Sequence, residues 1–139
     1  MERKEFLRLS CMLCVAIGGA MTFAELESCA SVPAIEADAK DKTISLPLSL
    51  FQDREIQIVR PKNLGFEIAV RKLPDATFTA LVLRCTHASN ELEYTGSLFY
   101  CSVHGSTFAL DGTATRGPAS KPLQALATRV DGANLTILL

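Results

Sequence analysis

The chain of 139 residues has no tryptophan, only two histidines and almost no net charge, with a formal value of −1. Without tryptophan, a core must be filled by Phe, Leu, Val and Ile, and 48% of the residues are hydrophobic. Nucleic-acid binding needs a concentrated basic face, so the near-neutral balance predicts no nucleic-acid partner. The sequence also contains no internal repeat and no glycine-rich phosphate loop.

Cysteine is scarce in the part of the chain that can fold. Three of the five cysteines, Cys11, Cys14 and Cys29, lie in the first 29 residues, and only Cys85 and Cys101 lie beyond them. Each of these two is followed by a histidine, which leaves no spare pair for a structural disulfide. A small domain with two Cys and two His in this pattern indicates a metal site.

The N-terminal region has the features of an export signal. A charged start precedes residues 9–24, which carry no charge. A membrane-spanning helix needs about 20 apolar residues, so this shorter run with its two adjacent glycines favours a cleaved signal peptide over a retained membrane anchor. Residues 3–8, RKEFLR, also resemble the twin-arginine export motif, with Lys at the second Arg position.

A lipobox-like sequence follows this region. Leu26-Glu27-Ser28-Cys29 resembles a bacterial lipobox, although Glu27 departs from the usual small residue. The small, polar, proline-containing stretch 30–42 has the composition of a tether between an anchor and a domain. We therefore expect an export signal at 1–29, lipidation of Cys29, a tether at 30–42 and a folded domain at 43–139, on the periplasmic side of a bacterial membrane. Mass spectrometry of the mature N-terminus tests the lipidation.

Short alternating runs predict an all-β domain. No long helical period occurs after residue 42. Apolar residues alternate in 43–51, 56–58 and 66–70, and residues 78–85 form a mostly apolar run typical of a buried strand. Thr95–Gly96, Asp111–Gly112 and Asp131–Gly132 are turn signals. Many short strands with Gly and Pro punctuation favour an antiparallel sandwich or small barrel.

Both histidines and both domain cysteines fall in one window, CTHASNELEYTGSLFYCSVHGS. The pattern is Cys85-x-His87, then thirteen residues, then Cys101-x-x-His104. Each half follows a predicted strand, so two loop tips could meet, each with one thiolate and one imidazole. This ligand set suits a tetrahedral zinc ion or a binuclear iron–sulfur cluster with two Cys on one iron and two His on the other.

The flanking residues resemble the Rieske family in three motifs. These are CTH in the first loop, C-x-x-HGS in the second and GPA-x-x-PL downstream. The resemblance covers most of residues 43–139 and implies a Rieske-like antiparallel β-structure, with a small cluster-binding subdomain of two loops. It also implies one Rieske-type [2Fe-2S] cluster per chain. On that resemblance Cys85 and Cys101 bind the buried iron, and His87 and His104 bind the outer iron.

The resemblance also assigns residues that tune the cluster. Ser106 matches a Ser whose hydroxyl, in quinol-oxidising relatives, donates to a bridging sulfide and stabilises the reduced cluster. Two positions later those relatives carry a Tyr that bonds a ligand cysteine, and here the residue is Phe108. We therefore expect a potential below that of the high-potential members.

A second departure concerns how the loops are held together. High-potential relatives join them by a disulfide, at positions occupied here by Asn90 and Val103. The loops must then rely on apolar packing and on cover from Gly117, Pro118 and the alanine that follows. Proline fixes the backbone there without needing a hydrogen-bond partner for its nitrogen.

The ligand set predicts an electron-transfer protein. Two neutral imidazoles leave the oxidised cluster less negative than four thiolates would, which raises its potential. We expect an exported carrier or redox subunit whose partner proteins meet the exposed His87/His104 edge. The alternatives are the Rieske subunit of a quinol-oxidising cytochrome complex, the small subunit of an arsenite-oxidase-like molybdoenzyme and, more remotely, a structural zinc site. The chain is too short to hold an oxygenase catalytic domain as well.

Overall fold

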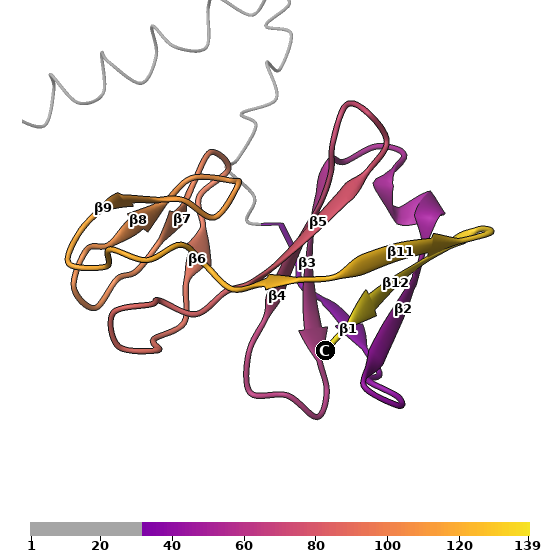
Figure 1. The fold of residues 1–139 in the computed structure, drawn as a ribbon, viewed down its shortest axis with the longest axis horizontal. Helices are drawn as coiled ribbons and strands as arrows, with labels where there is room; N and C mark the ends of the chain where they lie inside the picture. The colour runs from indigo at the N-terminus through magenta and orange to yellow at the C-terminus, as the bar shows by residue number, and fades with distance from the viewer. Residues whose placement is uncertain (1–31) are drawn as a thin grey trace, which may run out of the picture. The chain divides into compact units, whose positions relative to one another are not determined.

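The computed structural model describes residues 32–139, which form three small β-sheets and one short 3₁₀ helix, η1 (Leu48–Phe51) (Figure 1). The largest sheet has five strands in the order β1-β3-β4-β5-β10. Their bounds are Ile35–Ala37, Ile56–Pro61, Ile68–Lys72, Phe78–Val82 and Ala125–Leu126. All neighbouring pairs are antiparallel except β1 and β3, which run parallel.

Two smaller sheets flank the five-stranded sheet. One has three antiparallel strands in the order β11 (Thr128–Asp131), β12 (Asn134–Leu138) and β2 (Thr43–Pro47). The other is a four-stranded meander of β6 (Glu93–Tyr94), β7 (Phe99–Tyr100), β8 (Thr107–Phe108) and β9 (Ala114–Arg116). Figure 1 shows the meander and the three-stranded sheet on opposite sides of the central strands.

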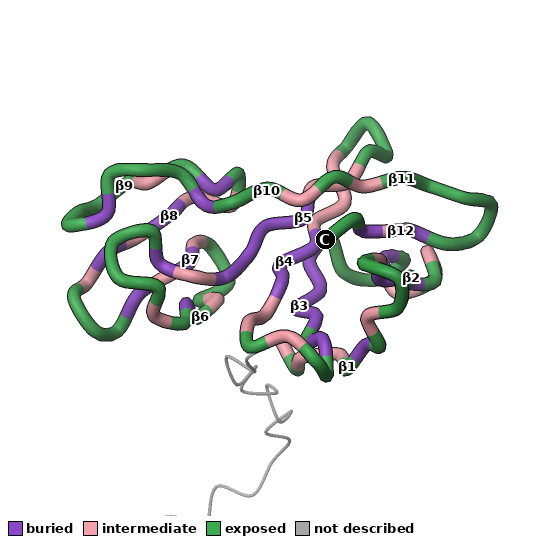
Figure 2. Tube along the Cα trace, turned by 60° about the horizontal axis from the view of Figure 1, so that its bottom comes forward, coloured by how far each residue is buried: buried purple, intermediate pink, exposed green. Residues whose placement is uncertain are grey.

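The central strands are buried on both faces, which explains their nearly continuous apolar sequence (Figure 2). Side chains alternate between faces along a strand. In β3, Ile56 and Ile58 join the cluster of core residues that includes Cys85 and Cys101, whereas Val59 joins the cluster that includes Ile44 of β2. The domain therefore has two apolar cores, one on each side of the central sheet, and the core shared with the meander holds both cysteines.

The predicted tether boundary requires correction. Residues 35–37, inside the stretch predicted as a tether, form β1 and pair with β3. Lys40 and Thr43 then close a two-residue turn with mutual backbone hydrogen bonds of 2.9 and 2.8 Å. Asp41 and Lys42 in this turn have φ of 49° and 60°. The small and polar composition of this stretch belongs to an edge strand and a tight turn, so the ordered domain begins before residue 43.

The all-β fold class is confirmed, and most predicted strands occur. The runs at 56–58, 66–70 and 78–85 contribute β3, β4 and β5, and all three turn signals lie in turns. The alternation over 43–51 was partly misread, because β2 ends at Pro47 and residues 48–51 form η1. None of the described residues belongs to a helix with the length and hydropathy of a membrane span.

Candidate metal centre

The first predicted ligand pair lies in a loop closed by its own backbone. After β5, Arg84 and Glu91 form an isolated antiparallel bridge, and the loop between them begins at Cys85. The Cys85 N–H donates to the Asn90 carbonyl at 2.8 Å, and the Ser89 N–H donates to the Cys85 carbonyl at 2.8 Å. Ser89 has φ of 57°, a left-handed conformation that lets the chain turn back after four residues.

The second pair lies in a loop of the same form. The Cys101 N–H donates to the Ser106 carbonyl at 2.9 Å, and the Gly105 N–H donates to the Cys101 carbonyl at 2.9 Å. Gly105 has φ of 79° and occupies the position that Ser89 has in the first loop. We call these two segments, 85–90 and 101–106, the cysteine rings. The first ring lies at the end of the Arg84–Glu91 bridge, and the second ring lies at the end of the β7–β8 hairpin.

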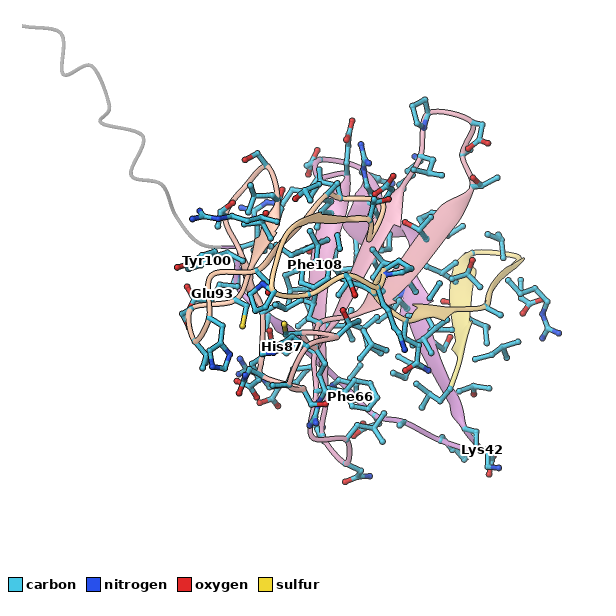
Figure 3. The ribbon with its side chains drawn as sticks, turned by 60° about the vertical axis from the view of Figure 1, so that its left-hand side comes forward. Lys42, Phe66, His87, Glu93, Tyr100 and Phe108 are labelled. Atoms are coloured by element: carbon cyan, nitrogen blue, oxygen red, sulfur yellow. The ribbon has the colours of Figure 1, made fainter. Side chains whose placement is uncertain are left out.

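The four predicted ligand side chains are brought to one end of the domain. Cys85 and Cys101 are buried in the same core and are free thiols, with exposed fractions of 2% and 0%. His87 and His104 are exposed, and their ring centroids lie 5.0 Å apart with the ring planes nearly perpendicular. Figure 3 shows His87 at the end of the domain away from Lys42. The site thus consists of an inner thiol pair and an outer imidazole pair.

Ser106, the last residue of the second ring, is fully buried against the segment that follows β9. Its hydroxyl oxygen accepts a hydrogen bond from the Ala119 N–H at 3.0 Å. The hydroxyl of Ser106 is also one of the groups that lower the pKa of the Cys85 thiol. Phe108, also fully buried, belongs to the core that contains both cysteines. The sulfide acceptor that the resemblance implies for the Ser106 hydroxyl stays a prediction.

Several donors converge on the sulfur of Cys85. Burial raises the pKa of this thiol. The opposing effect comes from four hydrogen-bonding groups, which together lower the pKa by more than burial raises it: the His87 N–H, the Ser106 hydroxyl, the Cys101 thiol and the Ala88 N–H. The net result is a pKa below the ordinary value for cysteine. The pocket therefore favours the thiolate, which is the form that binds a metal.

The segment 117–123 is tied to both cysteine rings. The Ala119 N–H bonds to Ser106 in the second ring, and the Thr86 hydroxyl in the first ring donates to the Lys121 carbonyl at 2.7 Å. Gly117 and Pro118 are exposed, whereas Ala119 and Leu123 of this segment are buried. Thr86 lies inside the CTH motif, but its link to residue 121 is 35 positions away in the chain and has no sequence signal.

Asn90 and Val103 face a groove of about 630 Å³ beside the rings. The two positions correspond to those that carry a disulfide in high-potential relatives, and here neither is a cysteine. Val103 is 56% exposed. Over residues 32–139 the hydrogen bonds of segment 117–123 and the shared apolar core hold the rings together, with no disulfide between them.

The donor set suits a binuclear cluster. In the described part of the chain, no three His, Cys, Asp or Glu side chains gather around one point as ligands of a single metal ion. The thiols and the imidazoles form two separate pairs, and two Cys with two His are the ligands of Rieske clusters. Cys29 lies outside the described residues.

Comparisons with known proteins agree with the motifs. The sequence profile of the Rieske [2Fe-2S] domain matches residues 48–127. The chain is 38% identical over 53 residues to the cytochrome b6-f complex iron-sulfur subunit of Synechococcus sp. (strain JA-3-3Ab). That alignment covers 37% of this chain and 31% of the relative, so the chain spans less than a third of that protein's length.

Two solved structures share the fold. The plasma membrane Rieske protein PetC3 of Synechocystis PCC 6803 superposes with a TM-score of 0.55 at 22% identity, over 67% of this chain and 95% of that one. A chain of a hyperthermophilic respiratory complex III superposes with a TM-score of 0.54 at 19% identity, over 95% of this chain and 92% of that one.

Proposed function

The chain belongs to the Rieske [2Fe-2S] domain family and is an iron–sulfur electron carrier, and we propose that its Rieske-type cluster is held by Cys85, Cys101, His87 and His104. The observation that carries this assignment is the matched pair of cysteine rings. They bring two buried thiols and two exposed imidazoles to one end of the domain.

Each pair of side chains has a distinct task in this proposal. The cluster, when bound, supplies a one-electron couple at a potential that His ligation raises. With the cluster bound, the buried thiols would keep water from the iron that they hold, and the donors around Cys85 stabilise negative charge on sulfur. The exposed imidazoles would extend the electron path to the surface, where a redox partner protein can make contact.

We further propose that the protein is exported and attached to the periplasmic side of a bacterial membrane by a lipid on Cys29. The support is the charged start, the uncharged run 9–24 and the lipobox-like LESC. Mass spectrometry of the purified mature protein decides this point. A diacylglyceryl-modified N-terminal Cys29 is expected, and any unmodified N-terminal residue other than Cys29 contradicts it.

An exported carrier is favoured over a subunit of a quinol-oxidising complex. Asn90, Val103 and Phe108 lack the cross-link and the hydroxyl that high-potential members use. The similarity to a cytochrome b6-f subunit keeps the complex as the second candidate. The small subunit of an arsenite-oxidase-like molybdoenzyme is the third candidate. A reduction potential as high as that of quinol-oxidising Rieske proteins would overturn our preference.

Electron paramagnetic resonance of the dithionite-reduced protein tests the ligand assignment. Protein labelled with ¹⁵N-histidine should show magnetic coupling from two histidine nitrogens to the reduced cluster. His87→Cys and His104→Cys should each remove one coupling, whereas Ser102→Ala, an exposed change in the same ring, should remove none. A colourless protein with stoichiometric zinc, or a paramagnetic cluster without nitrogen coupling, would overturn the proposal.

A further inference from the structure

Arg84 stands directly before Cys85, at the point where the chain leaves the central sheet and enters the first cysteine ring. Its backbone pairs with Glu91, so the residue is fixed at the base of the ring. Its side chain is half-buried, and it extends back toward the segment 62–67 that joins β3 to β4. Arg84 thus connects the ring with the sheet beneath it.

Two neighbours in the β3–β4 connection hold the guanidinium group. One terminal nitrogen, Nη2, donates a hydrogen bond to the Gly65 carbonyl, and the guanidinium carbon lies 5.9 Å from the centre of the Phe66 ring. This distance is within the range of a cation–π contact. A Cβ at residue 65 would lie 3.3 Å from Nη2, so glycine leaves the guanidinium the room that it occupies.

The charge of Arg84 is not neutralised by a carboxylate. Among residues 32–139, ion pairs within 4.0 Å involve Arg60, Lys62, Arg71 and Arg129, and Arg84 is in none of them. Glu67, two positions from Gly65, is already paired with Arg60. The Nε of Arg84 is buried and has no hydrogen-bond partner. The contacts of this side chain are therefore a carbonyl dipole and an aromatic face, which leave its full positive charge in place.

We propose that Arg84 raises the reduction potential of the cluster through this unneutralised charge, which Gly65 and Phe66 hold beneath the first cysteine ring. The proposal depends on the ligand assignment above. Reduction adds one negative charge to a site whose first ligand, Cys85, directly follows Arg84 in the chain, so a fixed cation favours the reduced state. Partial burial limits screening by salt. Gly65 and Phe66 act as positioning residues, because they set where the charge sits.

The test compares the midpoint potentials of cluster-loaded variants. With an effective protein dielectric of about 20, loss of the charge should lower the equilibrium constant for one-electron reduction by about three- to tenfold. Tenfold corresponds to about 59 mV for a one-electron couple. Arg84→Met and Arg84→Gln should both show this fall. Arg84→Lys keeps the positive charge but loses the planar guanidinium group, and this variant should retain most of the wild-type potential.

Arg71→Met is the matched control. Arg71 also has a buried Nε without a partner, but it lies on β4 outside the rings and pairs with Glu55 at 3.9 Å. Its loss should leave the potential unchanged. Equal potentials for wild type and both neutral Arg84 variants would overturn the proposal, and so would a fall in Arg84→Lys as large as in Arg84→Met.

Different measurements test the ligand assignment and the role of the Arg84 charge. The absorption and ¹⁵N-coupling spectra of the wild-type protein report on the ligand set before any potential is measured. Absence of those signatures refutes the ligand assignment, whereas their presence with no Arg84 effect refutes only the role of this charge. If neither Met nor Gln at position 84 gives a loaded protein, Arg84→Leu provides the test, and an unchanged potential would overturn the proposal.

Discussion

The Ser106 hydroxyl offers the sharpest single test of how the protein tunes its cluster. Ser106 is fully buried and accepts the Ala119 N–H at 3.0 Å, and its hydroxyl is one of the groups that lower the pKa of Cys85. Ser106→Ala removes both interactions with little change in volume. We expect two separable effects, one on the potential and one on stability.

The effect on the potential follows from the donor to sulfur. A hydrogen bond that is stronger in the reduced state by about 1 kcal/mol changes a one-electron potential by about 40 mV. Because the donor stabilises the more negative, reduced state, Ser106→Ala should lower the midpoint potential by that amount. Titration of the visible absorption against redox dyes measures the shift.

The effect on stability follows from the backbone N–H of Ala119, which is left without a hydrogen-bond acceptor. Ala119 is 6% exposed, and its N–H loses its acceptor, which costs about 1–3 kcal/mol of unfolding free energy. Chemical unfolding of the loaded protein measures this loss. Ser102→Ala, in the same ring but exposed, should leave both quantities unchanged. A loaded Ser106→Ala protein with the wild-type potential would refute the sulfur contact as a tuning element, whatever its stability.

Three further substitutions have expected outcomes. Phe108→Tyr should raise the midpoint potential by adding a hydroxyl donor near the buried thiols, and an unchanged or lower potential in folded protein would contradict this. Thr86→Val removes the 2.7 Å bond to the Lys121 carbonyl and should weaken the loaded domain by about 1 kcal/mol, seen as faster bleaching of the cluster in denaturant. Lys42→Gly relieves a left-handed conformation at φ 60° and should stabilise the domain by about 1 kcal/mol in urea unfolding, and a loss of stability would count against the turn geometry.

The strands that the sequence revealed are those with a one-sided or continuous apolar pattern. β3, β4 and β5 carry large aliphatic side chains, and burial of these residues against two cores leaves a pattern that can be read directly. β1 was missed because its three residues include Glu36 and lie at an edge, where one side of the strand is solvent. The turn at Asp41–Lys42 was missed because Asn–Gly or Asp–Gly is the usual signal for two successive left-handed residues.

The candidate site divides in the same way. The proposed ligand types and their spacing are local, so the motifs around Cys85 and Cys101 are enough to propose them. The ties from Thr86 to residue 121 and from Ser106 to Ala119 depend on how a distant segment packs, and no local pattern encodes that. The role proposed for Arg84 could not be predicted from local sequence either, because it depends on contacts with Gly65 and Phe66, which lie about twenty positions earlier.

The self-closure of the two cysteine rings has an evolutionary consequence. Each ring is completed by hydrogen bonds among its own residues, so neither depends on the length of chain that connects them. The connection, which contains the β6–β7 hairpin, is therefore free to gain or lose residues without disturbing the ligands. Searches for remote members of the family should hold each Cys–His half fixed and leave the distance between the halves open.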